Sequence, residues 1–326
     1  MRLGVVTRAS LLVCLLAAPV TLTALRLAQP LDTTAVQLVG LAPWAMPLYL
    51  IVALVAMAPT VRHRARTFYV MPAVLAVIGF ALHAVWFAPQ VTGEVRAPAE
   101  GAPRITVMAS NIQRGQGDAA ALLGAAAEHD VDVLVVEEIT PEALAAMRRA
   151  GLRERYPYAA GQPAPGAPGT MVFSRIRLSE PERLATGFGT WRMRVGGGLT
   201  LIAVHMTAPA DPQRWRTDFE EVLAAVRAQP PDLVVGDFNA TADHGPMRDL
   251  LAEGFRDGAE LDNHWRPTWP ANHRGDGVAR FLPPVAPIDH VLVGSRMAAL
   301  DSATVRVADT DHLAVVAQVA RAAGAA

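Results

Sequence analysis

The sequence predicts a membrane segment of three helices followed by a mixed α/β domain. Hydrophobic residues make up 52% of the 326 positions, the mean hydropathy is positive, and three long stretches near the N-terminus carry no charge. After residue 104, short apolar runs rich in β-branched residues alternate with stretches of helical spacing. A chain of this length has room for two domain-sized units.

The three uncharged stretches cover residues 9–25, 33–61 and 67–93. Each is long enough to cross a hydrocarbon core of about 30 Å as a helix, so we expect three membrane spans. Prolines inside a span are tolerated because neighbouring helices satisfy the freed carbonyls. They are Pro19, Pro43, Pro47 and Pro72.

Basic residues set the expected orientation of these spans. The loop between the first and second spans contains one acidic residue, Asp32, whereas arginines precede the first span and separate the second from the third: Arg2, Arg8, Arg62, Arg64 and Arg66. Positively charged flanks stay in the cytoplasm. The sequence therefore predicts a multi-pass protein of the cell membrane whose later residues are extracytoplasmic. The first stretch also fits a cleaved signal peptide, an alternative that the two following spans disfavour.

Composition divides the chain into a membrane domain (1–91), a linker rich in Gly, Pro and Ala (92–103), a globular domain (104–320) and a tail (321–326). Residues 104–326 contain 22 Arg against 27 Asp and Glu, a formal net charge of −5. Proteins that bind duplex nucleic acid usually carry the opposite sign.

Two residue types exclude several chemistries. The chain has no lysine, which excludes a Walker-type phosphate loop and Schiff-base catalysis. Its single cysteine, Cys14, lies in the first apolar stretch, so the globular domain has no disulfide, thiolate nucleophile or zinc–cysteine site.

Secondary structure in the globular domain follows from the apolar pattern. Helical spacing occurs at residues 119–129 and 218–228, and a further helix is expected to begin at Pro141 with Thr140 as its cap. The expected strands are 105–110, 131–138, 169–175, 199–206, 232–239, 288–294 and 313–320.

Polar residues stand at the ends of these strands or just before them. They are Asn111, Glu137, Glu138, His205, Asp237, Asn239, Asp289, His290, Asp311 and His312. One such residue alone is usually a turn or cap residue. Together they predict a cleft where a sheet gathers distant residues. Alternation along a strand would put Asp237 and Asn239 on one side and Phe238 on the other.

The motifs SNIQRG, LVVEEI, MVFSR, AVHM, GDFNAT, PIDHVLV and DHLAVV run through the whole globular domain. In these motifs the chain resembles the endonuclease/exonuclease/phosphatase superfamily, which includes deoxyribonucleases, apurinic-site endonucleases, inositol polyphosphate 5-phosphatases and sphingomyelinases. The N-terminus further resembles a membrane-anchored bacterial branch associated with vancomycin and teicoplanin resistance. The resemblance implies an α/β (α+β) four-layer sandwich, with two mixed β-sheets face to face and helices outside.

The resemblance also implies a metal site. Glu138 matches the family's metal-binding glutamate, Glu137 replaces a glutamine, and Asn111 and Asp311 are the further expected ligands. Oxygen ligands of this kind suit Mg²⁺, with Mn²⁺ as an alternative ion. Gln113 stands where some relatives have an acidic ligand, which favours one metal over two.

Catalytic roles follow from the same match. His312 matches the catalytic histidine and Asp289 the carboxylate that orients its ring. His205 matches a second histidine of the deoxyribonuclease and sphingomyelinase branches. We expect Asp237 to orient or deprotonate the attacking water, and Asn239 and His205 to hold phosphoryl oxygens.

The predicted function is Mg²⁺-dependent hydrolysis of a phosphodiester, phosphomonoester or pyrophosphate outside the membrane. Arg114, Trp191 and Arg266 are candidate substrate-binding residues, although tryptophans more often only pack. The expected substrate is amphiphilic, such as a lipid-linked phosphate of the cell envelope, or a nucleotide phosphoester. Two alternatives remain open: an extracellular nuclease and a catalytically silent phosphate-binding sensor. The sequence indicates no protein partner.

Overall fold

The computed structural model of the chain describes residues 2–57, 66–93, 95–196, 198–261, 263–274 and 277–324. The chain divides into two units, residues 1–89 with 243–245 and residues 90–242 with 246–326. Arg62 and Arg64, on which the expected orientation partly depends, lie outside the described residues.

The first unit contains two apolar helices long enough to cross a membrane, α1 (Arg2–Ala28) and α4 (Arg66–Phe87). The second apolar stretch, expected to cross the membrane as one helix, is not one continuous helix over its described residues 33–57. Instead α2 (Thr33–Val39) and η1 (Ala42–Trp44), which leads into α3 (Ala45–Met57), are bent by 60° at a short break. Pro43 lies in the first turn after the break, where its missing N–H costs no helical hydrogen bond. This pair forms a third span only if it is counted as one broken helix.

The helices of this unit pack closely and share one polar cluster. A Cβ on Gly79 of α4 would lie 2.4 Å from the Tyr49 ring of α3, so glycine lets these helices approach. The Thr23 hydroxyl of α1 lies 2.9 Å from both the Tyr49 hydroxyl and His83 Nε2. Many apolar side chains point outward, with Met71 and Val85 both 69% exposed, as expected of helices that face lipid.

The second unit contains two six-stranded sheets. The first has the order β11-β12-β1-β2-β4-β3, in which only β1 and β2 are parallel. Its strands are β1 (Ile105–Asn111), β2 (Val133–Glu137), β3 (Tyr158–Gln162), β4 (Thr170–Ser174), β11 (Met297–Arg306) and β12 (Leu313–Arg321).

The second sheet has the order β5-β6-β7-β8-β10-β9, in which only β7 and β8 are parallel. Its strands are β5 (Leu178–Arg183), β6 (Trp191–Val195), β7 (Leu199–His205), β8 (Leu233–Asp237), β9 (Arg256–Asp257) and β10 (Asp289–Val293). Apolar residues from both sheets, among them Val107, Val135, Leu201 and Val235, form one buried cluster between them.

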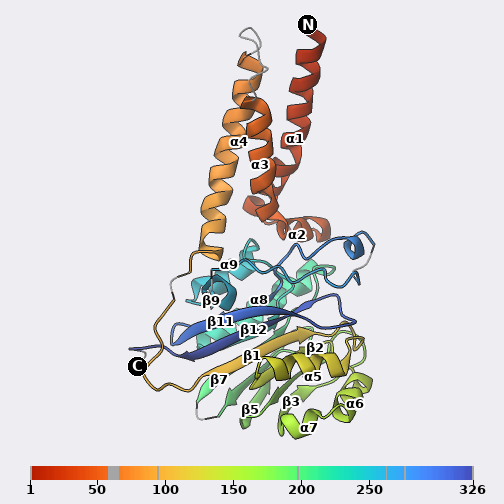
Figure 1. The fold of residues 1–326 in the computed structure, drawn as a ribbon, viewed down its shortest axis with the longest axis vertical. Coiled ribbons are helices and arrows are strands. Elements are labelled where there is room, and N and C mark those ends of the chain that lie inside the picture. The colour runs from red at the N-terminus through yellow and green to blue at the C-terminus, as the bar shows by residue number, and fades with distance from the viewer. Residues whose placement is uncertain are drawn as a thin grey trace. The chain divides into compact units, whose positions relative to one another are not determined.

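Helices complete the layers on the two outer faces (Figure 1). Residues of α5 (Ala119–Glu128), α6 (Pro141–Arg149) and α7 (Leu152–Arg155) pack with the outward side chains of the first sheet. From α8 (Pro212–Ala228), Phe219 packs against Phe238, which follows β8. The remaining helices among the described residues are η3 (Ala88–Gln90), α9 (Gly245–Ala252), α10 (Gly258–Leu261) and η4 (Ala279–Phe281). The sandwich of two mixed sheets with helices outside is thus confirmed.

Each expected strand and helix of the globular domain is present. The Thr140 side chain caps α6 as expected, by accepting from Ala143 N at 3.2 Å. The α8 helix begins six residues before the expected start, because Asp211 caps it and Pro212 occupies its first position. Part of the segment expected as a linker pairs with the second unit, where Ala99 N donates to Arg321 O at 2.8 Å.

Replacing Phe219, which is 2% exposed, by alanine should lower the stability of the second unit by about 3–5 kcal/mol, because it leaves a cavity under α8. Denaturant unfolding of the full chain in detergent, followed by tryptophan fluorescence, measures this change. The matched variant Arg216→Ala on the exposed face of α8 should cost less than about 1 kcal/mol. Equal losses in the two variants would contradict this packing.

Candidate active site

Two rows of polar residues meet where the strands of the two sheets end. In the first sheet, Asn111 pairs with Glu137 at the end of the parallel β1–β2 pair. In the second, His205 pairs with Asp237 at the end of the parallel β7–β8 pair, and Asp237 pairs with Asp289 across β8 and β10. Because parallel strands end at the same edge, the sheets bring these side chains together.

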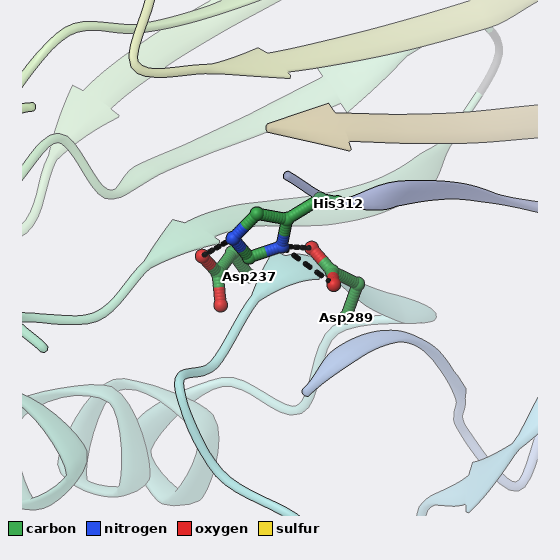
Figure 2. A group of neighbouring side chains, drawn as sticks. All are labelled: Asp237, Asp289 and His312. Atoms are coloured by element: carbon green, nitrogen blue, oxygen red, sulfur yellow. Dashed lines mark hydrogen bonds and ion pairs between the residues drawn. The ribbon is translucent and has the colours of Figure 1, made fainter. Parts of the chain in front are cut away.

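His312 lies between two carboxylates (Figure 2). Its Nδ1 lies 2.9 and 3.1 Å from the two oxygens of Asp289, and its Nε2 lies 3.9 Å from Asp237 Oδ2. All three residues are buried. Nδ1 donates to Asp289, which fixes the ring and directs Nε2 toward Asp237. The Asp289–His312 pair expected from the sequence is therefore in place.

Asn111 connects Asp237 with Glu138. Its Nδ2 donates to Asp237 Oδ2 at 2.9 Å and to Glu138 Oε1 at 3.3 Å. The other Glu138 oxygen accepts from the backbone N–H of Arg114 at 2.6 Å. Glu138 has a φ of 58°, an uncommon conformation for this residue type, and so turns its carboxylate from the strand end into the cluster.

Asn239 reaches the cluster by a different route from the one expected. Strand β8 ends at Asp237, and Asn239 has a φ of 48°, so strand alternation does not place its side chain. Its backbone N–H donates to Asp237 Oδ1 at 2.8 Å, and its Nδ2 donates to Met206 O at 3.0 Å. A left-handed turn therefore brings Asn239 beside Asp237.

His205 and Glu137 are fully buried under this cluster. His205 Nε2 lies 3.8 Å from Asp237 Oδ2 and 3.9 Å from Glu138 Oε1, and its ring packs on Phe188. Among the described residues, neither oxygen of Glu137 has a hydrogen-bond partner, and a Cβ added at Gly236 would lie 2.7 Å from Oε1.

Burial and mutual repulsion displace the pKa values of this cluster. Burial, followed by the charge of Asp289, raises the pKa of Asp237 to about 6. Burial lowers the pKa of His205. Burial also acts to lower the pKa of His312, but the charges of Asp289 and Asp237 outweigh it and hold this pKa well above the ordinary value. Near neutral pH these directions favour a protonated His312 and a neutral His205.

A family model for the endonuclease/exonuclease/phosphatase family matches residues 108–312, well over half of the chain. The chain belongs to this family. Its members are hydrolases that act on phosphoester bonds. The matched region spans the strand ends described above, from Met108 of β1 to His312.

Solved structures show the same fold in the second unit. TDP2 of D. rerio complexed with single-stranded DNA product has a TM-score of 0.54 at 16% identity, covering 66% of this chain and 98% of that one. An AP endonuclease of Archaeoglobus fulgidus has a TM-score of 0.51 at 16% identity, covering 65% and 98%. An endonuclease/exonuclease/phosphatase family protein of Bacteroides thetaiotaomicron has a TM-score of 0.52 at 14% identity, covering 68% of this chain and 98% of that one. No curated protein sequence matches the chain.

Enzymes of this family typically use a divalent metal, and the cluster offers two sets of ligands for one. Asp237, Asp289 and His312 present ligand atoms within 4.8 Å of one another, but Asp289 is occupied by His312 Nδ1. Glu138, which is only partly buried, faces Asp237 across the Asn111 amide, whose Nδ2 donates to both carboxylates. The Asn111 Oδ1, the atom that could bind a metal, accepts from Gln113 N at 2.9 Å. Burial raises the pKa of Glu138, a cost that a cation would offset. The second set therefore fits a metal better.

The other expected ligand and the expected substrate residues lie in different surroundings. Asp311 Oδ1 lies 4.0 Å from His312 Nε2, at the edge of the cluster. The Arg114 side chain is exposed, and its contact to Glu138 comes from the backbone. Trp191 packs on the apolar cluster between the sheets. Arg266 lines a pocket behind Asp289.

Two threonines, which the sequence pattern did not single out, hold the Asp289–His312 pair. Thr310 Oγ1 donates to Asn111 O at 2.7 Å and accepts from His312 N at 3.3 Å. Thr268 Oγ1 accepts from Asp289 N at 3.3 Å. A threonine in a loop has no sequence pattern that marks such a role, so only the fold identifies it.

Replacing Gly236 by alanine should destabilise the protein by about 3 kcal/mol or more, because the added Cβ would lie 2.0 Å from Val204 O at a φ of 140°. Gly124→Ala is the matched control, since nothing lies within 4 Å of that Cβ in helix α5 and alanine favours helix. Thermal unfolding of both full-length variants provides the comparison. A Gly236→Ala protein as stable as the control would contradict the close approach of β7 and β8.

Glu260 of α10, which lines the pocket behind Asp289, predicts a pH dependence of stability. Burial, followed by the charge of Asp257, raises its pKa from 4.5 to about 7. The folded state thus binds the Glu260 proton more tightly than the unfolded state does. The stability that this tighter binding contributes is fully present below the unfolded pKa and is lost as pH rises through 7. Glu260→Gln should therefore gain stability relative to wild type between about pH 4.5 and 7. A difference in melting temperature that does not change with pH would contradict this.

Proposed function

We propose that this protein is a membrane-tethered, Mg²⁺-dependent phosphoesterase whose active site lies outside the cytoplasm. The observation that carries the proposal is the Asp289–His312 pair, directed at Asp237 in the same buried cluster as Asn111 and Glu138. These residues come from strand ends and loops far apart in the sequence. Chain connectivity alone does not bring them together, which supports a catalytic rather than a purely structural role.

The proton chemistry follows from the two carboxylates beside His312. Asp237 has a pKa near neutrality, because burial and Asp289 raise it, and it therefore serves to orient and deprotonate the attacking water. Asn111 and Asn239 donate to its two oxygens and fix the carboxylate. The His312 imidazolium, held by Asp289, stabilises negative charge that develops on the phosphoryl group.

Neutral His205 and the Asn239 amide complete the proposed phosphate site. In this proposal His205, between Asp237 and Glu138, and Asn239, beside Asp237, hold phosphoryl oxygens. Mg²⁺, or Mn²⁺ in its place, would be held by Glu138 with Asn111, and Asp311 is a further proposed ligand. When bound, the ion neutralises charge on the phosphate. Gln113 makes a single-metal site the preferred form.

The membrane tether is proposed from the first unit. We count the bent pair α2 and α3 as one span, which gives three spans with α1 and α4. Within this unit, the N-terminus and the start of α4 lie at the same end of the bundle (Figure 1). Arg2 and Arg8 of α1 and Arg66 at the start of α4 belong to this one side, which the positive-inside rule makes cytoplasmic. The chain leaves α4 at the opposite end, so the second unit follows outside.

An amphiphilic phosphoester of the cell envelope is the proposed substrate. The tether keeps the site near lipid, and the net charge of −5 disfavours a polyanion. A nuclease is the second candidate, because the similar structures include TDP2 in complex with single-stranded DNA product and an AP endonuclease. Arg114, Trp191 and Arg266 remain proposed contacts for either substrate. The full chain assayed on lipid pyrophosphates, phospholipids, inositol phosphates and DNA separates the two.

Asp289→Asn should lower kcat on a chromogenic phosphodiester by about 10²- to 10⁴-fold, because His312 then loses both its orientation and the charge that keeps it protonated. Another Asp–His pair of the same sheet, partly buried Asp257 with buried His290, provides the matched control. Asp257→Asn should leave kcat within a few-fold. Equal losses would mean that the assay reports folding and would overturn the assigned role of Asp289.

Glu138→Gln should raise the Mg²⁺ concentration needed for half-maximal activity by about 10-fold or more, because one carboxylate ligand is lost. Activity of the wild type should vanish with a chelator and return with Mg²⁺ or Mn²⁺. If the wild type hydrolyses each phosphoester as fast with a chelator as with Mg²⁺, the metal-dependent mechanism is excluded. A wild type that binds phosphate but hydrolyses nothing would support the sensor alternative.

A further inference from the structure

We propose that residues 278–282 dock on a lipid surface and present the active site to phosphoesters in that surface. The substrate part of this inference rests on the proposed function, whereas the docking itself does not. The segment, VARFL, includes η4 and lies in the long connection between α10 and β10.

Apolar exposure in the second unit is concentrated in this segment. Five large apolar side chains are exposed among the described residues of that unit, and three of them belong to residues 278–282. Val278 is 74% exposed, Phe281 71% and Leu282 42%. The other two, Val95 and Tyr158, are far apart in sequence. A soluble surface rarely collects large apolar groups in one turn unless something covers them.

Hydrogen bonds fix the turn in this exposed form. Phe281 N donates to Val278 O and Leu282 N to Ala279 O, both at 3.0 Å, which forms a single 3₁₀ turn. His273 Nδ1 lies 3.0 Å from Arg280 O and ties the turn to the preceding part of the loop. The apolar side chains are therefore presented outward by an ordered backbone, so docking requires little further ordering.

The base of the same loop touches the catalytic residues. Trp269 Nε1 donates to Asp311 Oδ2 at 3.2 Å, next to His312 in the chain. Thr268 O accepts from Leu313 N at 2.9 Å, and the Thr268 hydroxyl accepts from Asp289 N at 3.3 Å. After the turn, Val285 N donates to Trp269 O at 2.9 Å, which closes the loop onto this base. A surface that holds the turn is thus linked to the active site through a few contacts.

A lipid surface fits this segment better than a protein groove. Residues 277–284 contain no acidic residue, and the Arg280 guanidinium lies 4.8 Å from the centroid of the Phe281 ring. An aromatic ring with aliphatic neighbours and a basic group is the composition that enters the headgroup region of anionic bilayers. The helices of the first unit expose apolar side chains to a similar degree, for example Met71 at 69%. The bilayer anchor proposed for the first unit would strengthen this docking, because it raises the local lipid concentration, but the docking does not depend on it.

Docking is tested with a dye at a single cysteine in the full chain. In a Cys14→Ser background, which removes the only native cysteine, Phe281→Cys carries an environment-sensitive fluorophore in vesicles with anionic and nitroxide-labelled lipids. The matched control is Tyr158→Cys, an exposed position on the edge strand β3. We expect the emission at 281 to fall by about half or more and the emission at 158 to change little. Equal quenching at both positions, or none at 281, would overturn the docking proposal.

The consequence for the substrate is tested by making the turn polar. The triple variant Val278→Ser, Phe281→Ser and Leu282→Ser should lose about 10-fold or more of its activity on a phospholipid in vesicles and keep its activity on a soluble phosphodiester. The soluble assay also reports that the variant is folded. Equal activity of variant and wild type on both substrates would refute a role for docking in substrate choice. If wild type hydrolyses neither substrate, the proposed function fails, and the quenching experiment still decides whether the turn docks.

Discussion

Burial of carboxylates at one edge of the sandwich is the constraint on which the rest of the site depends. Five acidic residues gather there: Glu137, Glu138, Asp237, Asp289 and Asp311. Each charged form is costly in a dry interior unless a cation or a hydrogen-bond donor offsets it. His312 offsets Asp289, and Asn111 offsets Asp237. Burial raises the pKa values of Glu138 and Asp237, and the charge of Asp289 raises that of Asp237 further; a divalent cation would offset the same cost.

The two sheets bring these groups close together at one edge. Each sheet contains one parallel pair, β1–β2 or β7–β8, and each pair ends in polar residues at the shared edge. Gly236 allows the Glu137 carboxyl to fit between the sheets, and two non-glycine residues with positive φ, Glu138 and Asn239, turn toward the cluster. Such local strain persists because the surrounding core holds it, and it is common at functional sites.

Much of this arrangement could be predicted from the sequence. Strands with continuous β-branched runs, such as those ending at Asp237 and His205, were predictable because both of their faces are buried. Five strands among the described residues were not predicted: β3, β5, β6, β9 and β11. Of these, β5 is a mostly exposed polar edge strand and β9 has two residues. The resemblance to a known family supplied the roles of Glu138 and His312, which polar spacing alone does not assign.

Other features depend on tertiary structure and left no pattern to detect. Alternation was the wrong reason for placing Asn239 at the site, because the strand ends two residues earlier. The bend in the second apolar stretch was missed because hydropathy does not report a change in the direction of the helix axis. Thr310 and the exposed turn at Phe281 are likewise visible only once the loops are folded.

Hydrolysis in water enriched in ¹⁸O tests the central claim most directly. The account predicts that water activated at Asp237 attacks phosphorus, so the full chain with Mg²⁺ should place one ¹⁸O in the phosphate product of a phosphodiester during a single turnover. The His312→Ala protein should release no labelled product in the same time. Heavy oxygen in the alcohol product instead, or equal labelling of phosphate by the variant, would contradict the mechanism.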